Sequence, residues 1–371
     1  MAKKPNPSPA TSSSIGKPTP VTDPVPPDQR PHLLAPGSVI ALRVVGLNLE
    51  IALPADRPVF TIGSKTGAVD VVVPLSQISR LQAVAQRDGT WLTLRDQGST
   101  NGQYLNGRPE PTIHVAAGQV FRWANLDIVA LDDHLRDLRV RLAWFLGFDD
   151  HQRVDAALTI AARGGPLFLA ARRTCQPAAL ARAIHKASGR RAEPFRVIEA
   201  SEGLRQTDVR TVFAQASRGT VFLDLAAVDG EVPAYLAKWL FGADYGVRPV
   251  LTAPSHELAR KQLQQYAAQL ETIEVPSIAT RRSDAPRLLD GLLAELGTSR
   301  RIIELGRDRI PALGAFDWPE DIDQLRRAAE RIQAYLDHGR SVAAAAASIG
   351  VKPQTLHQAL RRIGAIGAGH R

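Results

Sequence analysis

Residues 166–188 of the sequence, PLFLAARRTCQPAALARAIHKAS, constrain the middle of this chain more than any other segment. The short apolar run at 167–169 and the helical spacing of apolar residues at 178–187 predict a strand, a polar loop and a helix. Such a loop cradles phosphate when glycines let backbone N–H groups approach the oxygens and a lysine reaches the outer ones. The loop at 171–178 has no glycine and no lysine, and Pro177 lacks a backbone N–H donor. We therefore predict the frame of a nucleotide-binding unit without its chemistry.

Further segments extend this pattern toward the C-terminus. PFRVIEAS and RGTVFLDL follow the predicted helix, and IEVPSIATRRSDAPRLLDGLLAEL (273–296) and DWPEDIDQLRRAAERI (317–332) come later. Together with LARAIHKAS they resemble the ATPase core of the sigma-54-dependent transcription activators, the bacterial enhancer-binding proteins. That family reads GESGTGKE at its phosphate loop, then ARAIH and GGTLFLDE. The resemblance implies an α/β, AAA+-like (P-loop-derived) core over residues 134–312.

The departures from this family fall on the residues that bind and cleave ATP. Pro177 stands where the family has the phosphate-loop lysine, and Leu225 replaces the glutamate that would polarise the attacking water. Asp224 is retained, and Asp323 stands where the family has a nucleotide-sensing arginine. The segment 200–218 is too short for the loop that carries the family's sigma-contact motif, GAFTGA. The resemblance therefore implies a degenerate core, for which neither ATP binding nor hydrolysis is expected.

Residues 37–133 predict a different architecture. Short strands separated by Gly, Pro, Asn and Asp are typical of an all-β sandwich. Two stretches, VFTIGSKTGAVDVVVPLSQISRLQAVA and LRDQGSTNGQYLNGRPE, resemble the forkhead-associated (FHA) domain. FHA domains bind phosphothreonine peptides, so the resemblance implies a phosphothreonine-containing protein as a partner. A phosphate group with a charge of about −1.5 to −2 is best held by charge-assisted donors and hydroxyls in a preformed loop cluster.

The binding positions of the FHA family are carried over residue by residue. They give a candidate phosphopeptide site made of Ser64, Lys65, Ser79, Arg80, Thr100 and Asn101. The resemblance implies that Ser79 and Thr100 hydrogen-bond the phosphate and that Asn101 holds the peptide backbone. Two positions depart from the family, because Ser64 replaces its phosphate-contacting arginine and Gln82 replaces a scaffold histidine. The cation at position 65 or at position 80 is the candidate for the missing positive charge.

The C-terminal residues 313–371 predict an all-α part. Apolar spacing predicts an amphipathic helix at 321–336, and Ser341 is the expected N-cap of a helix that Gly350 ends. The run AAAAASIGVKPQTLHQALRRIG resembles the Fis-type helix-turn-helix that closes most enhancer-binding proteins. The resemblance implies that its second helix enters the major groove of DNA. The DNA-binding candidates are Lys352, Gln354, Thr355, His357, Gln358, Arg361 and Arg362.

Composition limits the other functions that the chain can have. The net charge of +9 suits a polyanionic partner, although an arginine-rich proteome gives the same balance. Cys175 is the single cysteine, which excludes a disulfide framework and gives no metal-binding cluster. The chain has neither a signal-peptide core nor an apolar run of the roughly 18–20 residues that cross a bilayer, so we expect a cytoplasmic protein without membrane contact. Residues 1–36, rich in Pro, Ser and Thr, predict a disordered tail.

The combined interpretation is a bacterial transcriptional regulator that is not an enzyme. An FHA sensor at 37–133 precedes a catalytically silent core at 134–312 and a helix-turn-helix at 313–371. We expect a homodimer formed through the C-terminal region, with the helix at 325–336 as a candidate surface. One alternative is a phospho-dependent adaptor, which would lack salt-dependent DNA binding. Another is a working ATPase with an unorthodox loop, whose turnover Asp224→Asn would abolish.

Overall fold

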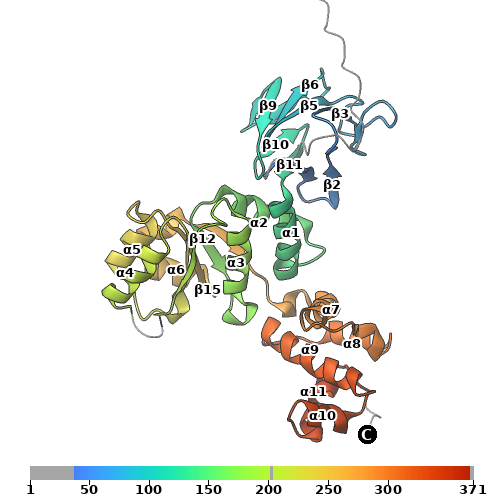
Figure 1. The fold of residues 1–371 in the computed structure, drawn as a ribbon, viewed down its shortest axis with the longest axis vertical. Coiled ribbons are helices and arrows are strands. Elements are labelled where there is room, and N and C mark those ends of the chain that lie inside the picture. The colour runs from blue at the N-terminus through green and yellow to red at the C-terminus, as the bar shows by residue number, and fades with distance from the viewer. Residues whose placement is uncertain (1–36, 201–203, 368–371) are drawn as a thin grey trace, which may run out of the picture.

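The computed structural model describes residues 37–200 and 204–367, so the disordered tail predicted for residues 1–36 lies outside the described residues. Along the chain, a β-sandwich is followed by an α/β unit and then by C-terminal helices (Figure 1). The last two helices, α10 (Val342–Ser348) and α11 (Pro353–Arg362), lie at the end of the molecule opposite the sandwich. The order of an all-β, an α/β and an all-α part was predicted from the sequence and is confirmed.

The N-terminal part packs two sheets face to face. One sheet has the strand order β2-β1-β11-β10-β7-β8 and the other has β4-β3-β5-β6-β9. Apolar side chains that alternate along the strands fill the space between the sheets, and Phe60, Leu94 and Trp123 are fully buried there. The strands are β1 (Ala41–Val44), β2 (Leu49–Ala52), β3 (Val59–Gly63), β4 (Val71–Val72), β5 (Ala83–Asp88), β6 (Trp91–Asp96), β7 (Gln103–Leu105), β8 (Arg108–Pro109), β9 (Thr112–Val115), β10 (Val120–Trp123) and β11 (Leu126–Leu131).

The middle part is built on a five-stranded parallel sheet in the order β13-β14-β15-β12-β16. Its central strands are apolar runs buried on both faces, as expected where helices cover a parallel sheet. The strands are β12 (Leu167–Ala170), β13 (Phe195–Ile198), β14 (Thr220–Asp224), β15 (Arg248–Ala253) and β16 (Glu271–Glu274). The helices are α1 (Asp133–Leu146), α2 (His151–Arg163), α3 (Pro177–Ala187), α4 (Gln206–Gln215), α5 (Ala234–Phe241) and α6 (His256–Leu263).

The C-terminal part begins with α7 (Ala285–Glu295), α8 (Arg309–Ala315) and α9 (Asp321–Asp337). The Ser341 hydroxyl caps α10 by accepting a hydrogen bond from the Ala344 N–H at 3.3 Å, as predicted. Gly350 follows α10 with a φ of 68°, a conformation that glycine adopts without strain. Leu356 and Leu360 of α11 are buried. None of the helices in the described ranges is long and apolar enough to span a bilayer.

The prediction that the helix at 325–336 offers a dimer surface is wrong for its apolar side. Leu325 and Ile332 are fully buried within a single chain, and α9 packs against α7, α10 and α11. Because neighbouring helices already cover this side, a second copy of the chain cannot bind there.

The sandwich and the α/β unit are joined without a linker. β11 is followed directly by α1. Asp132 caps the N-terminus of α1, because its side chain accepts a hydrogen bond from the Leu135 N–H at 2.8 Å. Val129 and Leu131 of β11 belong to the same buried cluster as Leu138 of α1. The two parts therefore share hydrophobic core, which restricts their motion relative to one another.

Candidate functional site

The predicted phosphate-binding hydroxyls meet where three loops of the sandwich converge. Just beyond the end of β3, the Ser64 N–H donates to the Ser79 carbonyl at 3.0 Å. The Thr100 N–H donates to the Ser79 hydroxyl at 3.0 Å, and the oxygens of the two hydroxyls are 3.5 Å apart. Residues from positions 64, 79 and 100 thus form one compact polar cluster.

Two cations, Lys65 and Arg80, directly follow the cluster residues Ser64 and Ser79 in the sequence. The Lys65 N–H donates to the Arg80 carbonyl at 3.3 Å, so the two residues are neighbours across adjacent chain segments. Both side chains are exposed, and neither forms an ion pair with a carboxylate of residues 37–200 or 204–367. Two cations that no acid neutralises, beside two hydroxyls, suit an anionic ligand.

The loops of the cluster are braced from within the domain. Gln82 is 2% exposed, and its Oε1 accepts a hydrogen bond from the Ser79 N–H at 3.1 Å. The Asn101 side-chain amide donates to the Gln77 carbonyl at 3.3 Å. A Cβ on Gly63 would lie 2.2 Å from a backbone carbonyl oxygen, so only glycine allows this approach. The glutamine in place of the scaffold histidine therefore still positions Ser79.

The loop between β12 and α3 is held by the N-terminal turn of α9. The Thr174 hydroxyl donates to Asp321 Oδ2 at 2.8 Å, and Gln176 Nε2 donates to Asp323 Oδ1 at 2.9 Å. Asp321 is fully buried, and its Oδ1 also accepts a hydrogen bond from the Ile278 N–H at 2.8 Å. Polar groups of the loop are thus bonded to carboxylates of the same chain.

Cys175 lies in this loop and is 3% exposed. Burial, followed by the neighbouring Asp321 carboxylate, raises the pKa of its thiol to about 12. The thiolate is the reactive form of cysteine, so this thiol is inert at neutral pH.

Two of the three residues at the degenerate nucleotide positions, Pro177 and Asp224, line a small cleft at the carboxyl ends of the strands. Two neighbouring cavities of about 200 Å³ each share Arg173, Pro177 and Asp224 in their linings. The Asp224 carboxylate accepts a hydrogen bond from the Ala226 N–H at 3.0 Å and lies 3.5 Å from Arg173 Nε. Leu225 is fully buried and offers no polar group. Among the described residues, no group of His, Cys, Asp and Glu is placed to hold a metal ion.

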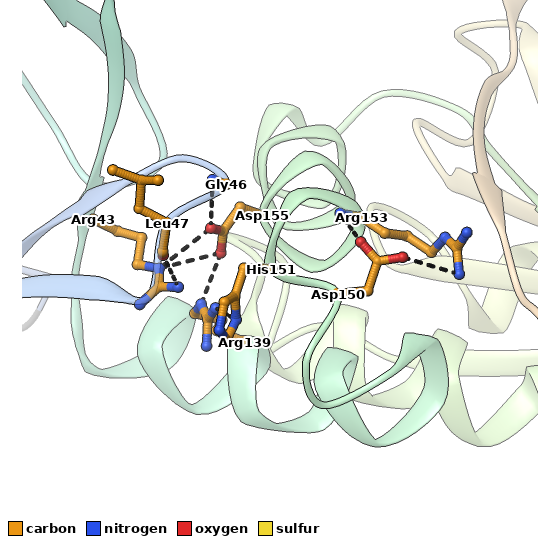
Figure 2. A network of polar contacts seen from close by, with 8 residues as sticks. All are labelled: Arg43, Gly46, Leu47, Arg139, Asp150, His151, Arg153 and Asp155. Carbon is orange, nitrogen blue, oxygen red and sulfur yellow. Dashed lines mark hydrogen bonds and ion pairs between the residues drawn. The ribbon is translucent and has the colours of Figure 1, made fainter. Parts of the chain in front are cut away.

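A buried polar network, which the sequence analysis missed, connects the sandwich to the α/β unit (Figure 2). The fully buried Asp155 of α2 accepts hydrogen bonds from the Gly46 N–H at 3.0 Å and from Arg139 Nε at 2.7 Å. Arg43 Nε of β1 lies 3.3 Å from both oxygens of this carboxylate. Burial lowers the pKa of the Arg43 guanidinium, and the nearby Asp155 charge raises it again in part. The alternation of apolar residues predicts β1, but it does not reveal a partner on a distant helix.

The predicted DNA-binding residues lie on α11 and the turn before it. Leu356 and Leu360 point inward, which leaves the opposite side of α11 to solvent. His357 is half-buried, and the exposed members of the predicted set are Lys352, Gln354, Thr355, Gln358, Arg361 and Arg362.

Comparison with known proteins identifies the sandwich. The family model of the FHA domain matches residues 60–124, so the chain contains an FHA domain, as predicted. The nitrogen assimilation regulatory protein NtrX of Azorhizobium caulinodans is 29% identical to this chain over 189 residues. That match covers 41% of this chain and 41% of the relative, so the chain matches about two fifths of the relative's length.

Two solved structures are similar to parts of this chain. NtrX from Brucella abortus is 17% identical, with a TM-score of 0.38, over 64% of this chain and 69% of that chain. The FHA domain of the CT664 protein from Chlamydia trachomatis is 26% identical, with a TM-score of 0.22. The latter match covers 25% of this chain and 95% of that domain.

Proposed function

We propose that this protein is a transcriptional regulator that receives a phosphothreonine signal through its FHA domain and binds DNA through α10 and α11. The observation that carries the proposal is the FHA domain with its hydroxyl cluster of Ser79 and Thr100. The sequence similarity to NtrX, a regulatory protein by name, supports the regulatory class.

The FHA cluster supports phosphothreonine binding despite the loss of the family arginine at Ser64. The Ser79 and Thr100 hydroxyls lie together. The exposed Lys65 and Arg80, each next in sequence to a residue of the cluster, form no ion pair in the described part of the chain. Hydrogen bonds to charged groups contribute about 1.5–3 kcal/mol each. One well-placed cation from position 65 or 80 therefore offsets the missing arginine contact.

The charge distribution of the C-terminal helices supports DNA binding. The sequence contains no Asp or Glu after Asp337. Lys352, Arg361 and Arg362 are exposed and form no ion pair within the described part of the chain. Cations that release counterions on contact with phosphates provide most of the affinity of a DNA-binding module. The exposed polar face of α11, with buried leucines behind it, suits entry into the major groove as a helix-turn-helix.

Several features support a core without ATPase activity. The loop at 171–177 lacks glycine and lysine, Pro177 occupies the first position of α3, and Leu225 is buried. In addition, Asp321 and Asp323 bond to side chains of this loop. These carboxylates add negative charge beside the place where a nucleotide phosphate would bind. In this proposal the α/β unit transmits the signal between the FHA domain and the C-terminal helices.

The buried Asp155 network and the shared hydrophobic core give a physical route for that coupling. Binding of a phosphorylated partner to the FHA domain is expected to change the affinity of α11 for DNA or the association of two copies. Equal DNA affinity with and without a saturating phosphothreonine peptide would contradict this coupling while leaving DNA binding itself intact.

The first experiment is capture of random genomic DNA fragments by the full-length protein over a salt series. It is run beside a triple variant, Lys352→Ala/Arg361→Ala/Arg362→Ala. Enrichment of one sequence by the wild-type protein, lost in the variant, is the expected result. Absence of any enrichment would favour a phospho-dependent adaptor whose C-terminal helices serve assembly.

A further inference from the structure

The segment 177–219 carries eight cationic side chains. They are Arg182, Lys186, Arg190, Arg191, Arg196, Arg205, Arg210 and Arg218. None forms an ion pair with a carboxylate in the described part of the chain. Elsewhere, Arg300 and Arg301, which lie between α7 and α8, and Arg326 of α9 are each paired with an acid.

Five of these residues surround the C-terminal end of α3, and we name them the α3-end surface: Arg182, Lys186, Arg190, Arg191 and Arg218. Lys186 follows Arg182 by about one turn of α3, so both lie on the same side of the helix. Arg190 Nη1 donates to the Arg218 carbonyl at 2.6 Å, which joins the end of α3 to the start of β14. The Arg182 guanidinium lies 4.6 Å from the centre of the Phe195 ring. Both contacts fix arginines without neutralising them.

The electrostatics of neighbouring groups agree with a concentration of positive charge. Burial and, after it, the charge of Arg190 lower the pKa of the Arg248 guanidinium to about 10. Burial is the main cause that lowers the pKa of the His185 imidazole. A backbone hydrogen bond with Glu193 raises this pKa in part, and the charges of Arg248, Arg182 and Lys186 lower it. Between positions 177 and 219 the eight cations stand against four acidic residues, Glu193, Glu199, Glu202 and Asp208, of which only Glu193 precedes position 199. The positive potential of the α3-end surface is therefore mostly uncompensated.

This surface is separate from the degenerate nucleotide cleft. The loop at 171–177 lies at the carboxyl ends of the parallel strands, and α3 starts there and runs back along the sheet. The C-terminal end of α3 consequently lies at the amino ends of the strands, beside the first residues of β13 and β14. Phosphate binding by a P-loop would take place at the carboxyl ends of the strands.

We propose that the α3-end surface binds the phosphate backbone of duplex DNA, as a contact without sequence specificity and independent of α11. Protein–DNA interfaces are strongly positive and polar, whereas protein–protein interfaces have an apolar or aromatic centre. The large apolar side chains that the described structure exposes are Leu47, Val59, Leu81, Trp91, Val140, Ile303 and Ile349. None belongs to the segment 177–219, so this surface lacks the centre that a protein partner would require.

The test measures the affinity of the full-length protein for a duplex of random sequence at several salt concentrations, by fluorescence anisotropy. The surface variant is Lys186→Gln/Arg191→Gln/Arg218→Gln, which keeps the arginines that hold Phe195 and the end of α3. A control variant, Arg141→Gln/Arg260→Gln/Lys261→Gln, removes the same charge from exposed, unpaired cations of α1 and α6. Thermal melting checks that both variants are folded.

The slope of log affinity against log salt concentration changes by about 0.9 for each phosphate contact. We expect the slope to become shallower by about 2–3 in the surface variant and by less than 1 in the control. Equal slopes for the two variants would overturn the proposal, as would acidic protein segments binding this surface in preference to DNA. The α11 triple-alanine variant is measured in parallel. If the α11 variant binds DNA with the affinity of the wild-type protein while the surface variant binds DNA more weakly, the helix-turn-helix proposal fails and the proposal for the α3-end surface stands.

Discussion

The Thr174 hydroxyl donates a 2.8 Å hydrogen bond to the carboxylate of Asp321, 147 residues further along the chain. The contact joins the loop after β12 to the first residue of α9, so it connects the α/β unit with the C-terminal helices. Asp321 is fully buried and adopts a φ of 49°, a left-handed conformation that is uncommon for a residue other than glycine. A buried carboxylate in such a conformation persists only where its hydrogen bonds are specific.

We expect Asp321→Ala to lower the free energy of unfolding by about 2–4 kcal/mol, because each buried group left without its partner costs about 1–3 kcal/mol. The groups left without a partner are the Thr174 hydroxyl and the Ile278 N–H. Urea denaturation followed by tryptophan fluorescence provides the measurement, since the buried Trp318 lies next to this site in the chain. The control is Asp317→Ala, which removes an exposed partner of Arg282 and should cost less than about 1 kcal/mol. Equal effects of the two substitutions would show that the Asp321 contacts do not stabilise the fold.

The Cys175 thiol should make stability fall at alkaline pH. Its pKa is raised from the ordinary value of 9.0 to about 12 in the folded chain, first by burial and then by Asp321. The unfolded chain therefore releases this proton at lower pH than the folded chain, and the stability that the group contributes is lost as pH rises above about 9. We expect the wild-type protein to lose about 1.4 kcal/mol per pH unit relative to Cys175→Ala between pH 9 and pH 12.

Thiol labelling gives an independent check of the same burial. A disulfide exchange reagent at pH 8 should modify Cys175 only after denaturant is added. Rapid modification of the native protein would mean that the loop opens readily and that its contacts with α9 are weak.

Removal of the Asp155 carboxylate should loosen the FHA domain from the α/β unit. Asp155→Ala leaves the buried Arg43 guanidinium without its acidic partner, and breaking a buried ion pair in this way costs about 3–5 kcal/mol. We expect a second, lower-temperature transition in calorimetry and faster proteolysis near the β11–α1 junction. Asp137→Ala, which removes an exposed carboxylate of α1, is the matched control and should leave a single unfolding transition in calorimetry. If the unfolding transitions and the proteolysis of Asp155→Ala match those of the wild-type protein, apolar contacts alone stabilise the junction.

An arginine at position 64 should strengthen phosphothreonine binding. Ser64→Arg restores the residue that the FHA pattern places beside Ser79, and one charge-assisted contact is worth about 1.5–3 kcal/mol. Affinity for a phosphothreonine peptide library should rise about ten- to a hundred-fold, measured by fluorescence polarisation. Lys65→Gln and Arg80→Gln, tested separately, should lower it and show which cation contacts the phosphate. If neither substitution changes the affinity, these exposed cations do not take part.

Local features were predictable from the sequence because their causes are local. The amphipathic helix α9 and the Ser341 cap of α10 follow from apolar spacing and capping preferences. The FHA loops were found because GSTNG is a short contiguous motif. The contacts of Asp155 and Asp321 were not predicted, because each joins segments more than 100 residues apart. A carboxylate that is fully buried in the fold cannot be distinguished in a sequence from one on a solvated helix face.

We expect the degenerate core to remain unable to bind or hydrolyse ATP even when its missing side chains are restored. Pro177→Lys/Leu225→Glu returns the lysine and the glutamate, but the loop still lacks glycine, and its Thr174 and Gln176 side chains remain bonded to Asp321 and Asp323. We expect no ATP binding by calorimetry at millimolar nucleotide and no phosphate release. Adding Asp321→Ala and Asp323→Ala to the double variant tests whether the α9 carboxylates are the obstacle. Nucleotide binding by the double variant alone would show that the original lysine and glutamate sites were the only defects, and the proposed role of α9 in occupying this loop would be wrong.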